Sequence, residues 1–157
     1  MTTGLAVLVV ALTVATVLGV AKRRYDGRFR DAGPSPRADV GAPAPPAAGV
    51  VEVLTAADLA GELGERATLV QFSSAFCAPC RATRALLRDV AGKEEGVAYV
   101  EVDAESQLDL VRRLRIMRTP TVFVLDADGK VIVRASGQPR RPDVLAALLR
   151  ATGQRVT

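Results

Sequence analysis

The sequence of 157 residues predicts an α/β fold in which a central mixed sheet is flanked by helices. Between residues 50 and 114, short apolar runs typical of strands alternate with segments of helical periodicity, and this alternation requires parallel strands. Two further apolar runs, 121–125 and 130–134, enclose a short turn and predict an antiparallel hairpin. An uncharged stretch at residues 4–21 predicts one transmembrane helix before the domain.

The apolar stretch at residues 4–21 would rise about 27 Å as a helix, close to the hydrocarbon thickness of a bilayer. Residues 1–3 form a short tail without a basic side chain, which disfavours a signal peptide, although cleavage after Ala21 stays open as an alternative. Lys22–Arg24 follow at once, and positive residues favour the cytoplasmic side. We therefore expect a single-pass protein of the cell membrane with a cytoplasmic domain. The alternative is that the domain lies on the extracytoplasmic face.

Residues 22–49 predict a disordered linker, basic at first and then rich in Pro and Ala. They hold five of the nine prolines and show no hydrophobic periodicity. Most of the net charge of +4 lies in this segment, whereas basic and acidic residues nearly balance over the expected domain, 50–157. A balanced domain surface argues against nucleic acid as a partner.

The first elements of the domain follow from apolar runs and capping signals. Residues 50–54 predict a strand. Thr55 and Asp58 match the capping-box pattern that opens a helix, which we expect to continue to residue 63. The mostly apolar run 67–72 predicts a strand in the centre of the sheet.

The later elements follow from the same periodicities of 3.6 and 2 residues. Helices are expected from Cys77 or Ala78 to Ala91, over 105–114 and from 141 onward, and strands at 97–102, 121–125 and 130–134. Asp126–Gly129 supply turn-forming residues between the last two strands. This order predicts a mixed sheet, because the hairpin adds antiparallel strands to parallel ones.

Cys77 and Cys80 are the only cysteines, and they stand three residues apart where the strand at 67–72 gives way to a helix. The N-terminus of a helix stabilises an anion, so a cysteine there has a lowered pKa and becomes a usable nucleophile. Pro79 suits the first helical turn, where its missing N–H is not needed. An inert structural disulfide, a pair of buried thiols and a zinc site shared between two chains are alternatives, although two sulfurs fill only half of a zinc tetrahedron.

Composition excludes several other kinds of chemistry. The chain contains no histidine, which removes Ser–His and Cys–His catalysis and most catalytic zinc sites. Asp126 and Asp128 have no third oxygen ligand at a useful spacing, so we interpret them as turn formers and expect no metal.

Three motifs of the sequence can be compared with those of a known family. Phe76–Cys80 reads FCAPC, Thr119-Pro120 precedes a strand, and the turn Asp126–Gly129 is followed by Gly137. Together with the element order over roughly residues 50–151, these motifs resemble the thioredoxin family, whose active site reads WCGPC and faces a cis-proline. The resemblance implies a thioredoxin-like fold and a protein thiol–disulfide oxidoreductase.

The resemblance also implies a role for each residue near the dithiol. Cys77 would be the nucleophile that forms a mixed disulfide with the substrate. Cys80 would be the resolving thiol that releases the substrate. Phe76, Thr119 and a cis Pro120 would bind the substrate segment.

The implied cofactors and partners are few. No cofactor is expected beyond the redox-active Cys77–Cys80 disulfide, and no metal. The partners would be protein thiol or disulfide substrates and an electron donor that the sequence does not identify. Attachment to a membrane through residues 4–21 is similar to the arrangement of membrane-anchored thioredoxin-like proteins.

The sequence departs from the family pattern at four positions near the dithiol. Gln71 stands where the family has a buried Asp that accepts the proton of the second cysteine, and Gln cannot act as a base. Phe76 replaces Trp, Ala78 replaces Gly, and Tyr99 replaces a basic residue. Gln71, Ala78 and Pro79 are expected to surround the dithiol without reacting. The missing carboxylate leaves a second function open, a thioredoxin-like binding module with slow or idle redox chemistry.

Overall fold

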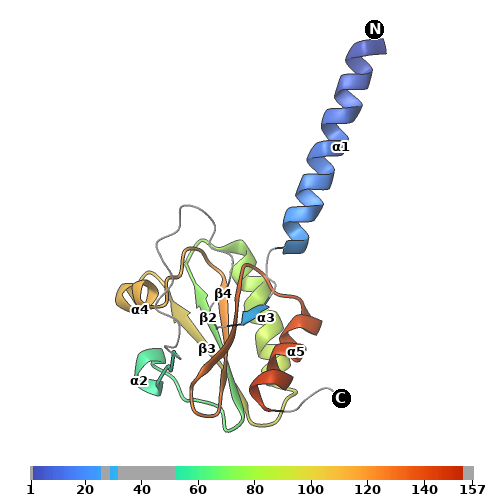
Figure 1. The fold of residues 1–157 in the computed structure, drawn as a ribbon. Helices are drawn as coiled ribbons and strands as arrows, with labels where there is room; N and C mark the ends of the chain where they lie inside the picture. The colour runs from blue at the N-terminus through green and yellow to red at the C-terminus, as the bar shows by residue number, and fades with distance from the viewer. Residues whose placement is uncertain (1, 26–28, 32–51, 154–157) are drawn as a thin grey trace.

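The computed structural model describes residues 2–25, 29–31 and 52–153, which form five helices and five strands (Figure 1). The helices are α1 (Thr2–Tyr25), α2 (Ala56–Leu59), α3 (Ala78–Ala91), α4 (Leu108–Arg113) and α5 (Arg141–Ala151). The strands are β1 (Phe29–Asp31), β2 (Ala67–Ser73), β3 (Val97–Asp103), β4 (Thr121–Asp126) and β5 (Val131–Ser136).

The strands form one sheet in the order β1-β5-β4-β2-β3. Among the described strands only β2 and β3 pair in parallel, with Leu69 opposite Tyr99, and the other neighbours are antiparallel. β2 lies between β3 and β4, and every one of its residues is buried. The predicted mixed sheet and its central strand at 67–72 are therefore confirmed.

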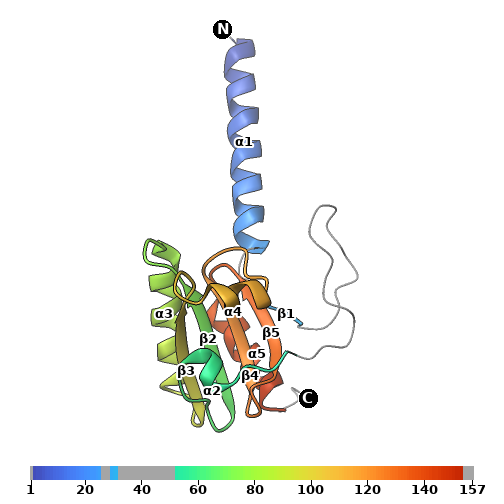
Figure 2. The same ribbon diagram turned by 90° about the vertical axis from the view of Figure 1, so that its left-hand side faces the viewer.

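Helices cover both faces of this sheet (Figures 1 and 2). Val70 and Phe72 of β2 pack into an apolar cluster that includes residues of α2 and α4. Leu69 packs on the other side, in a cluster with Leu87 of α3 and Val144 of α5. Burying each large apolar side chain contributes about 1.5–3 kcal/mol. Because β2 supplies both layers, it is a rigid base for the loop that leads to α3.

The predicted strand at 50–54 is wrong in its extent. Val53 makes only an isolated antiparallel bridge with Lys130, and residues 50 and 51 lie outside the described part of the chain. The chain leaves the sheet after Leu54 because the capping box at Thr55 starts α2 there. The rest of the β5 edge pairs with β1, three residues that the sequence did not indicate as a strand.

Two helices are shorter than predicted. α2 has the expected capping box, with the Thr55 hydroxyl accepting from Asp58 N–H, but it ends at Leu59 because Ala60 takes a left-handed conformation at φ 49°. α4 begins at Leu108 instead of residue 105. Before it, the Asp103 side chain accepts from the backbone N–H of Glu105 and holds a turn in place of the first helical residues.

The N-terminal segment forms α1, which stands clear of the domain (Figure 2). Across the residues that the structure describes, no helix is both long and apolar enough to cross a membrane. The transmembrane character predicted for residues 4–21 is therefore not confirmed, although their helical conformation is. The predicted disorder of 22–49 is wrong at residues 22–25, where good helix formers extend α1, and at 29–31, which form β1. The remaining linker residues lie outside the described part.

Candidate active site

The junction between β2 and α3 holds the two cysteines in one disulfide. Cys77 is the N-cap of α3 and has an extended backbone conformation. Its Sγ accepts a hydrogen bond from the backbone N–H of Cys80 at 3.2 Å, and the two Cα atoms are 5.2 Å apart. Pro79 lies in the first turn, as predicted. The sulfur of Cys77 thus lies where the free N–H groups of a helix favour negative charge.

The two sulfurs differ in their access to solvent. Cys80 is 1% exposed and packs inside the domain, whereas Cys77 is partly exposed. Phe76, directly before it, is 98% exposed, an unusual position for a large aromatic side chain. Ala78 and Pro79 are also exposed. A partner molecule can therefore reach Cys77 but not Cys80.

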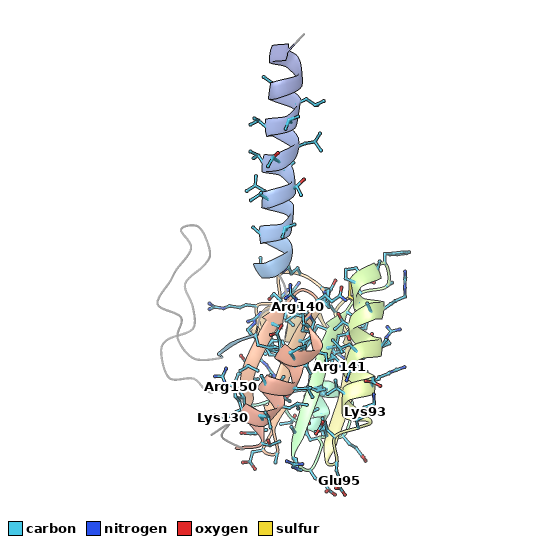
Figure 3. All side chains as sticks on the ribbon, turned by 90° about the vertical axis from the view of Figure 1, so that its right-hand side faces the viewer. Lys93, Glu95, Lys130, Arg140, Arg141 and Arg150 are labelled. Atoms are coloured by element: carbon cyan, nitrogen blue, oxygen red, sulfur yellow. A yellow bond between two sulfur atoms is a disulfide. The ribbon has the colours of Figure 1, made fainter. Side chains whose placement is uncertain are left out.

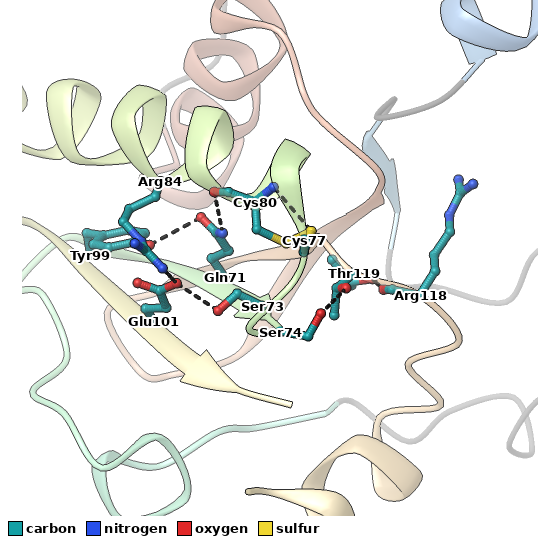
Figure 4. Close-up of a disulfide and its surroundings, with 11 residues drawn as sticks. Gln71, Ser73, Ser74, Cys77, Cys80, Arg84, Tyr99, Glu101, Arg118 and Thr119 are labelled. Carbon is teal, nitrogen blue, oxygen red and sulfur yellow. Dashed lines mark hydrogen bonds and ion pairs between the residues drawn. A yellow bond between two sulfur atoms is a disulfide. The ribbon is translucent and has the colours of Figure 1, made fainter. Parts of the chain in front are cut away.

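The loop before β4 lies beside the disulfide (Figure 4). Its Thr119–Pro120 peptide bond is cis, which confirms the predicted conformation. The Thr119 hydroxyl hydrogen-bonds the Ser74 hydroxyl at 3.0 Å, which ties this loop to the one that carries Cys77. The carbonyl oxygen of Pro120 accepts from the backbone N–H of Gly137 at 2.7 Å. Met117, three residues before Pro120, is 86% exposed.

Gln71 lies under the disulfide and is fully buried. Its Nε2 donates to the carbonyl oxygen of Cys80 at 3.0 Å, and its Oε1 accepts from the Tyr99 hydroxyl at 3.2 Å (Figure 4). Both ends of the amide are therefore used in holding α3 to β2 and β3. Burial, the largest influence on this group, raises the pKa of Tyr99 to about 12. Its hydroxyl therefore stays protonated and can donate to Gln71. This pair occupies two of the four positions where the sequence departs from the family pattern.

An ion pair beside the disulfide was not predicted. Glu101 accepts from Arg84 at 2.5 Å and from the Ser73 hydroxyl at 2.7 Å, both through Oε1 (Figure 4). Burial alone would raise the pKa of Glu101, but hydrogen bonds from Arg84 and Ser73 outweigh it and hold the pKa below its usual value. The only feature of the sequence that could have indicated Glu101 as a neighbour of the disulfide was the alternation of side chains in β3. That alternation places Glu101 on the same face of the sheet as Tyr99.

These residues belong to a hollow of about 400 Å³ beside the disulfide. Its walls are Ser73, Ser74, Ala75, Cys77, Cys80, Arg81, Arg84, Glu101 and Asp103. A second hollow of about 250 Å³, which includes Arg66 and Leu145, contains no thiol. Within the described residues, no group of three or more Cys, Asp or Glu side chains could hold a metal ion. The thiol pair is therefore the chemically distinctive feature of the larger hollow.

A dithiol at the start of a helix, beside a cis-proline and over the central strand of a mixed sheet, defines a thioredoxin-type domain. A family model for the thioredoxin-like domain matches residues 54–153. The chain belongs to the thioredoxin-like domain family, as the motifs Phe76–Cys80 and Thr119-Pro120 indicated.

The chain is similar to part of several thioredoxins and thioredoxin domain-containing proteins. The chain is 39% identical over 70 residues to human thioredoxin domain-containing protein 2, a match that covers 45% of this chain and 13% of that protein. It is 30% identical over 69 residues to rice thioredoxin H2-1, covering 44% of this chain and 49% of the relative. The chain thus spans at most about half the length of these relatives.

Solved thioredoxin structures share the fold. Fasciola hepatica thioredoxin aligns with a TM-score of 0.50 at 23% identity, covering 56% of this chain and 83% of that one. Chloroplastic thioredoxin z aligns with a TM-score of 0.51 at 23% identity, covering 57% and 80%. At these identities the likeness concerns the fold alone.

Proposed function

We propose that this protein is a thiol–disulfide oxidoreductase that acts on protein substrates through Cys77 and Cys80. The observation that carries the proposal is the disulfide at the N-terminus of α3, with Cys77 accessible and Cys80 buried. Membership of the thioredoxin-like domain family supports it. The exposed side chain of Phe76, next to Cys77 in the sequence, offers an apolar contact for a substrate segment that approaches Cys77.

In the reducing direction, the Cys77 thiolate attacks one sulfur of a substrate disulfide. The substrate S–S bond breaks, a Cys77–substrate disulfide forms, and the other substrate sulfur leaves as a thiolate. The Cys80 thiolate then attacks Sγ of Cys77 and displaces the second substrate sulfur, and both substrate thiolates take up protons. The pair ends oxidised, and a dithiol donor must reduce it for another cycle. The reverse sequence oxidises a substrate dithiol.

The helix supports the charge that these steps require. The dipole of α3 and the backbone N–H of Cys80 both point toward Sγ of Cys77 and would stabilise its thiolate. Gln71 cannot accept the proton of Cys80, and Glu101 is a weak base because hydrogen bonds from Arg84 and Ser73 lower its pKa in spite of burial. We therefore assign proton acceptance to water in the hollow that Cys80 helps to line.

Trapping of a mixed disulfide tests the proposal. In Cys80→Ser, Cys77 still attacks but nothing resolves the product, so the variant is expected to accumulate substrate-linked species that reductant releases. Non-reducing electrophoresis and mass spectrometry of membranes and extracts would measure them. The double variant Cys77→Ser, Cys80→Ser is the matched control and should trap nothing.

The same experiment addresses a binding module with slow or idle redox chemistry. The observation that favours this second function is Gln71, which is fully buried and has both ends of its amide hydrogen-bonded. A Cys80→Ser variant that traps no more protein than the double variant would contradict the oxidoreductase. Partners captured without a disulfide, and equally well by the unaltered protein, Cys80→Ser and the double variant, would favour the binding module.

We also propose that α1 attaches the domain to a membrane, with the domain on the cytoplasmic side. Large apolar side chains of α1, from Val7 to Val20, are about half exposed or more, and an apolar helix in water favours transfer into lipid. Lys22–Arg24 in its last turn support the cytoplasmic orientation.

A membrane-impermeant maleimide tests this orientation. After mild reduction of intact cells, Cys77 is expected to remain unlabelled and to become labelled once the membrane is permeabilised. Equal labelling before and after permeabilisation would contradict the cytoplasmic assignment. It would place the domain on the extracytoplasmic face, where secreted or membrane-bound thiol proteins would be its substrates.

A further inference from the structure

α1 joins the domain at the same end as the disulfide, as the strand registers require. In the antiparallel pair of β1 and β5, Phe29 lies opposite Ala135. In the antiparallel pair of β4 and β5, Thr121 lies opposite Ser136. Phe29, where the chain enters the sheet, therefore lies at the end of β5 that adjoins the start of β4. That start follows the cis peptide beside the disulfide.

The link between α1 and the sheet is short. Three residues separate Tyr25 from Phe29, so extended chain can place the two residues at most about 14 Å apart. β1 is held by its pairing with β5, and Phe29 packs against the apolar cluster of α3 and α5. Figures 1 and 2 show α1 rising from the end of the domain where α3 begins. The end of the domain that carries the disulfide thus stays close to the end of α1.

The surface at this end is rich in arginine. Arg81 and Arg84 line the hollow beside the disulfide, and Arg118 precedes Thr119. Figure 3 shows Arg140 at the end of the domain nearest α1, whereas Glu95 lies at the opposite end. The acidic side chains of the hollow are Glu101, which pairs with Arg84, and Asp103. An arginine-rich surface beside an apolar helix complements anionic lipid head groups.

We propose that the disulfide faces the membrane to which α1 attaches the domain. Its substrates are then cysteine pairs of membrane proteins that lie close to the bilayer surface, not those of freely diffusing proteins. The proposal rests on the oxidoreductase function and on membrane attachment, and the exchange step is the one given above. A short link raises the effective concentration of such cysteine pairs at Cys77. It does not raise the effective concentration of cysteine pairs that the tethered domain cannot reach.

Reconstituted full-length protein tests the proposal. It is placed in vesicles of phosphatidylcholine and phosphatidylglycerol with a transmembrane peptide that carries a disulfide directly after its span. A second peptide carries the same disulfide after a flexible spacer of about 30 residues, which averages roughly 30 Å in length. The near disulfide is expected to exchange at least about 10-fold faster than the far one, because of its effective concentration.

An insertion between α1 and the sheet removes the short link without changing the residues around the disulfide. A flexible segment of about 30 residues between Gly27 and Arg28 is expected to erase the preference for the near disulfide, because it lets the domain reach both targets. The same segment inserted after Gly153 is the matched control and should leave the preference intact. Equal rates for the two disulfides in the unaltered protein, or a preference that survives the insertion at Gly27, would overturn the proposal.

Two further measurements distinguish the causes of failure. Exchange with a soluble disulfide peptide in detergent reports the chemistry alone, and flotation with the vesicles reports attachment alone. Loss of the soluble reaction would overturn the oxidoreductase function and this proposal with it. Failure to float would overturn attachment and the proposal, but not the chemistry. Normal results in both, without preference for the near disulfide, would overturn only the proposed orientation.

Discussion

Replacing Cys77 with serine is expected to reduce exchange with a substrate disulfide by at least about 1,000-fold, because the accessible nucleophile is lost. A serine hydroxyl at the N-cap of α3 still accepts the N–H of Cys80, so the start of the helix is preserved. Cys80, the remaining thiol, is 1% exposed and cannot meet a protein disulfide. Stopped-flow measurement of substrate thiol release gives the rate.

Cys80→Ser is the matched control for this experiment. It also removes one sulfur, but it should keep the first attack by Cys77 and show a single burst of thiol release without turnover. If Cys77→Ser retained exchange while Cys80→Ser lost the burst, Cys80 would be the nucleophile, and the access of the two sulfurs would not decide their roles. Circular dichroism of both variants checks that each one folds.

Replacing Gln71 with glutamate is expected to destabilise the domain by about 2–4 kcal/mol at neutral pH. The substitution keeps the shape of the side chain but removes the N–H that donates to the carbonyl oxygen of Cys80. An ionised carboxylate would then face that oxygen in a fully buried position, with Tyr99 as its hydrogen-bond donor. Burial would raise the pKa of the new carboxyl far above its usual value.

The direction of the pH dependence follows from that raised pKa. An acid whose pKa is higher in the folded state leaves stability unaffected below its unfolded pKa, near 4.3, and costs stability as the pH rises toward the folded pKa. Denaturant titrations of Gln71→Glu between pH 4 and 8 should therefore show a free energy of unfolding that falls with pH relative to the unaltered protein.

Gln71→Met is the matched control, because it has a similar volume and no charge. It should lose about 1–3 kcal/mol, the cost of the missing hydrogen bonds, with no added dependence on pH. If the free energy of unfolding of Gln71→Glu followed that of Gln71→Met at every pH, water would have to reach residue 71. Burial would then not set the charge of the glutamate.

Features encoded by neighbouring residues could be predicted from the sequence. The capping box of Thr55 and Asp58, the strand at 67–72 and the helix after Cys77 depend on side chains within a few positions of one another. The cis-proline followed from a motif, Thr119-Pro120, that resembles a known family. Local chemistry and a motif therefore sufficed for the thiol pair and for the fold that carries it.

Features that depend on distant partners could not be predicted. β1 is three residues, Phe29–Asp31, whose strand conformation depends on β5, about 100 residues later, and so short a segment shows no useful alternation. The ion pair of Glu101 and Arg84 joins β3 to α3, and nothing local to either residue indicates it. The early end of α2 reflects a left-handed residue, Ala60, where sequence favours helix.

β1 has a further consequence, for how this protein is prepared. It occupies the edge of β5 from Val133 to Ala135, and Glu52 and Val53 cover only the beginning of that strand. A fragment cut at residue 50, where the sequence placed the start of the domain, would leave part of this edge with unpaired N–H and C=O groups. Such an edge pairs readily with another chain. Soluble versions should therefore begin before Phe29, or they would assemble through the exposed strand and hide the behaviour of the single domain.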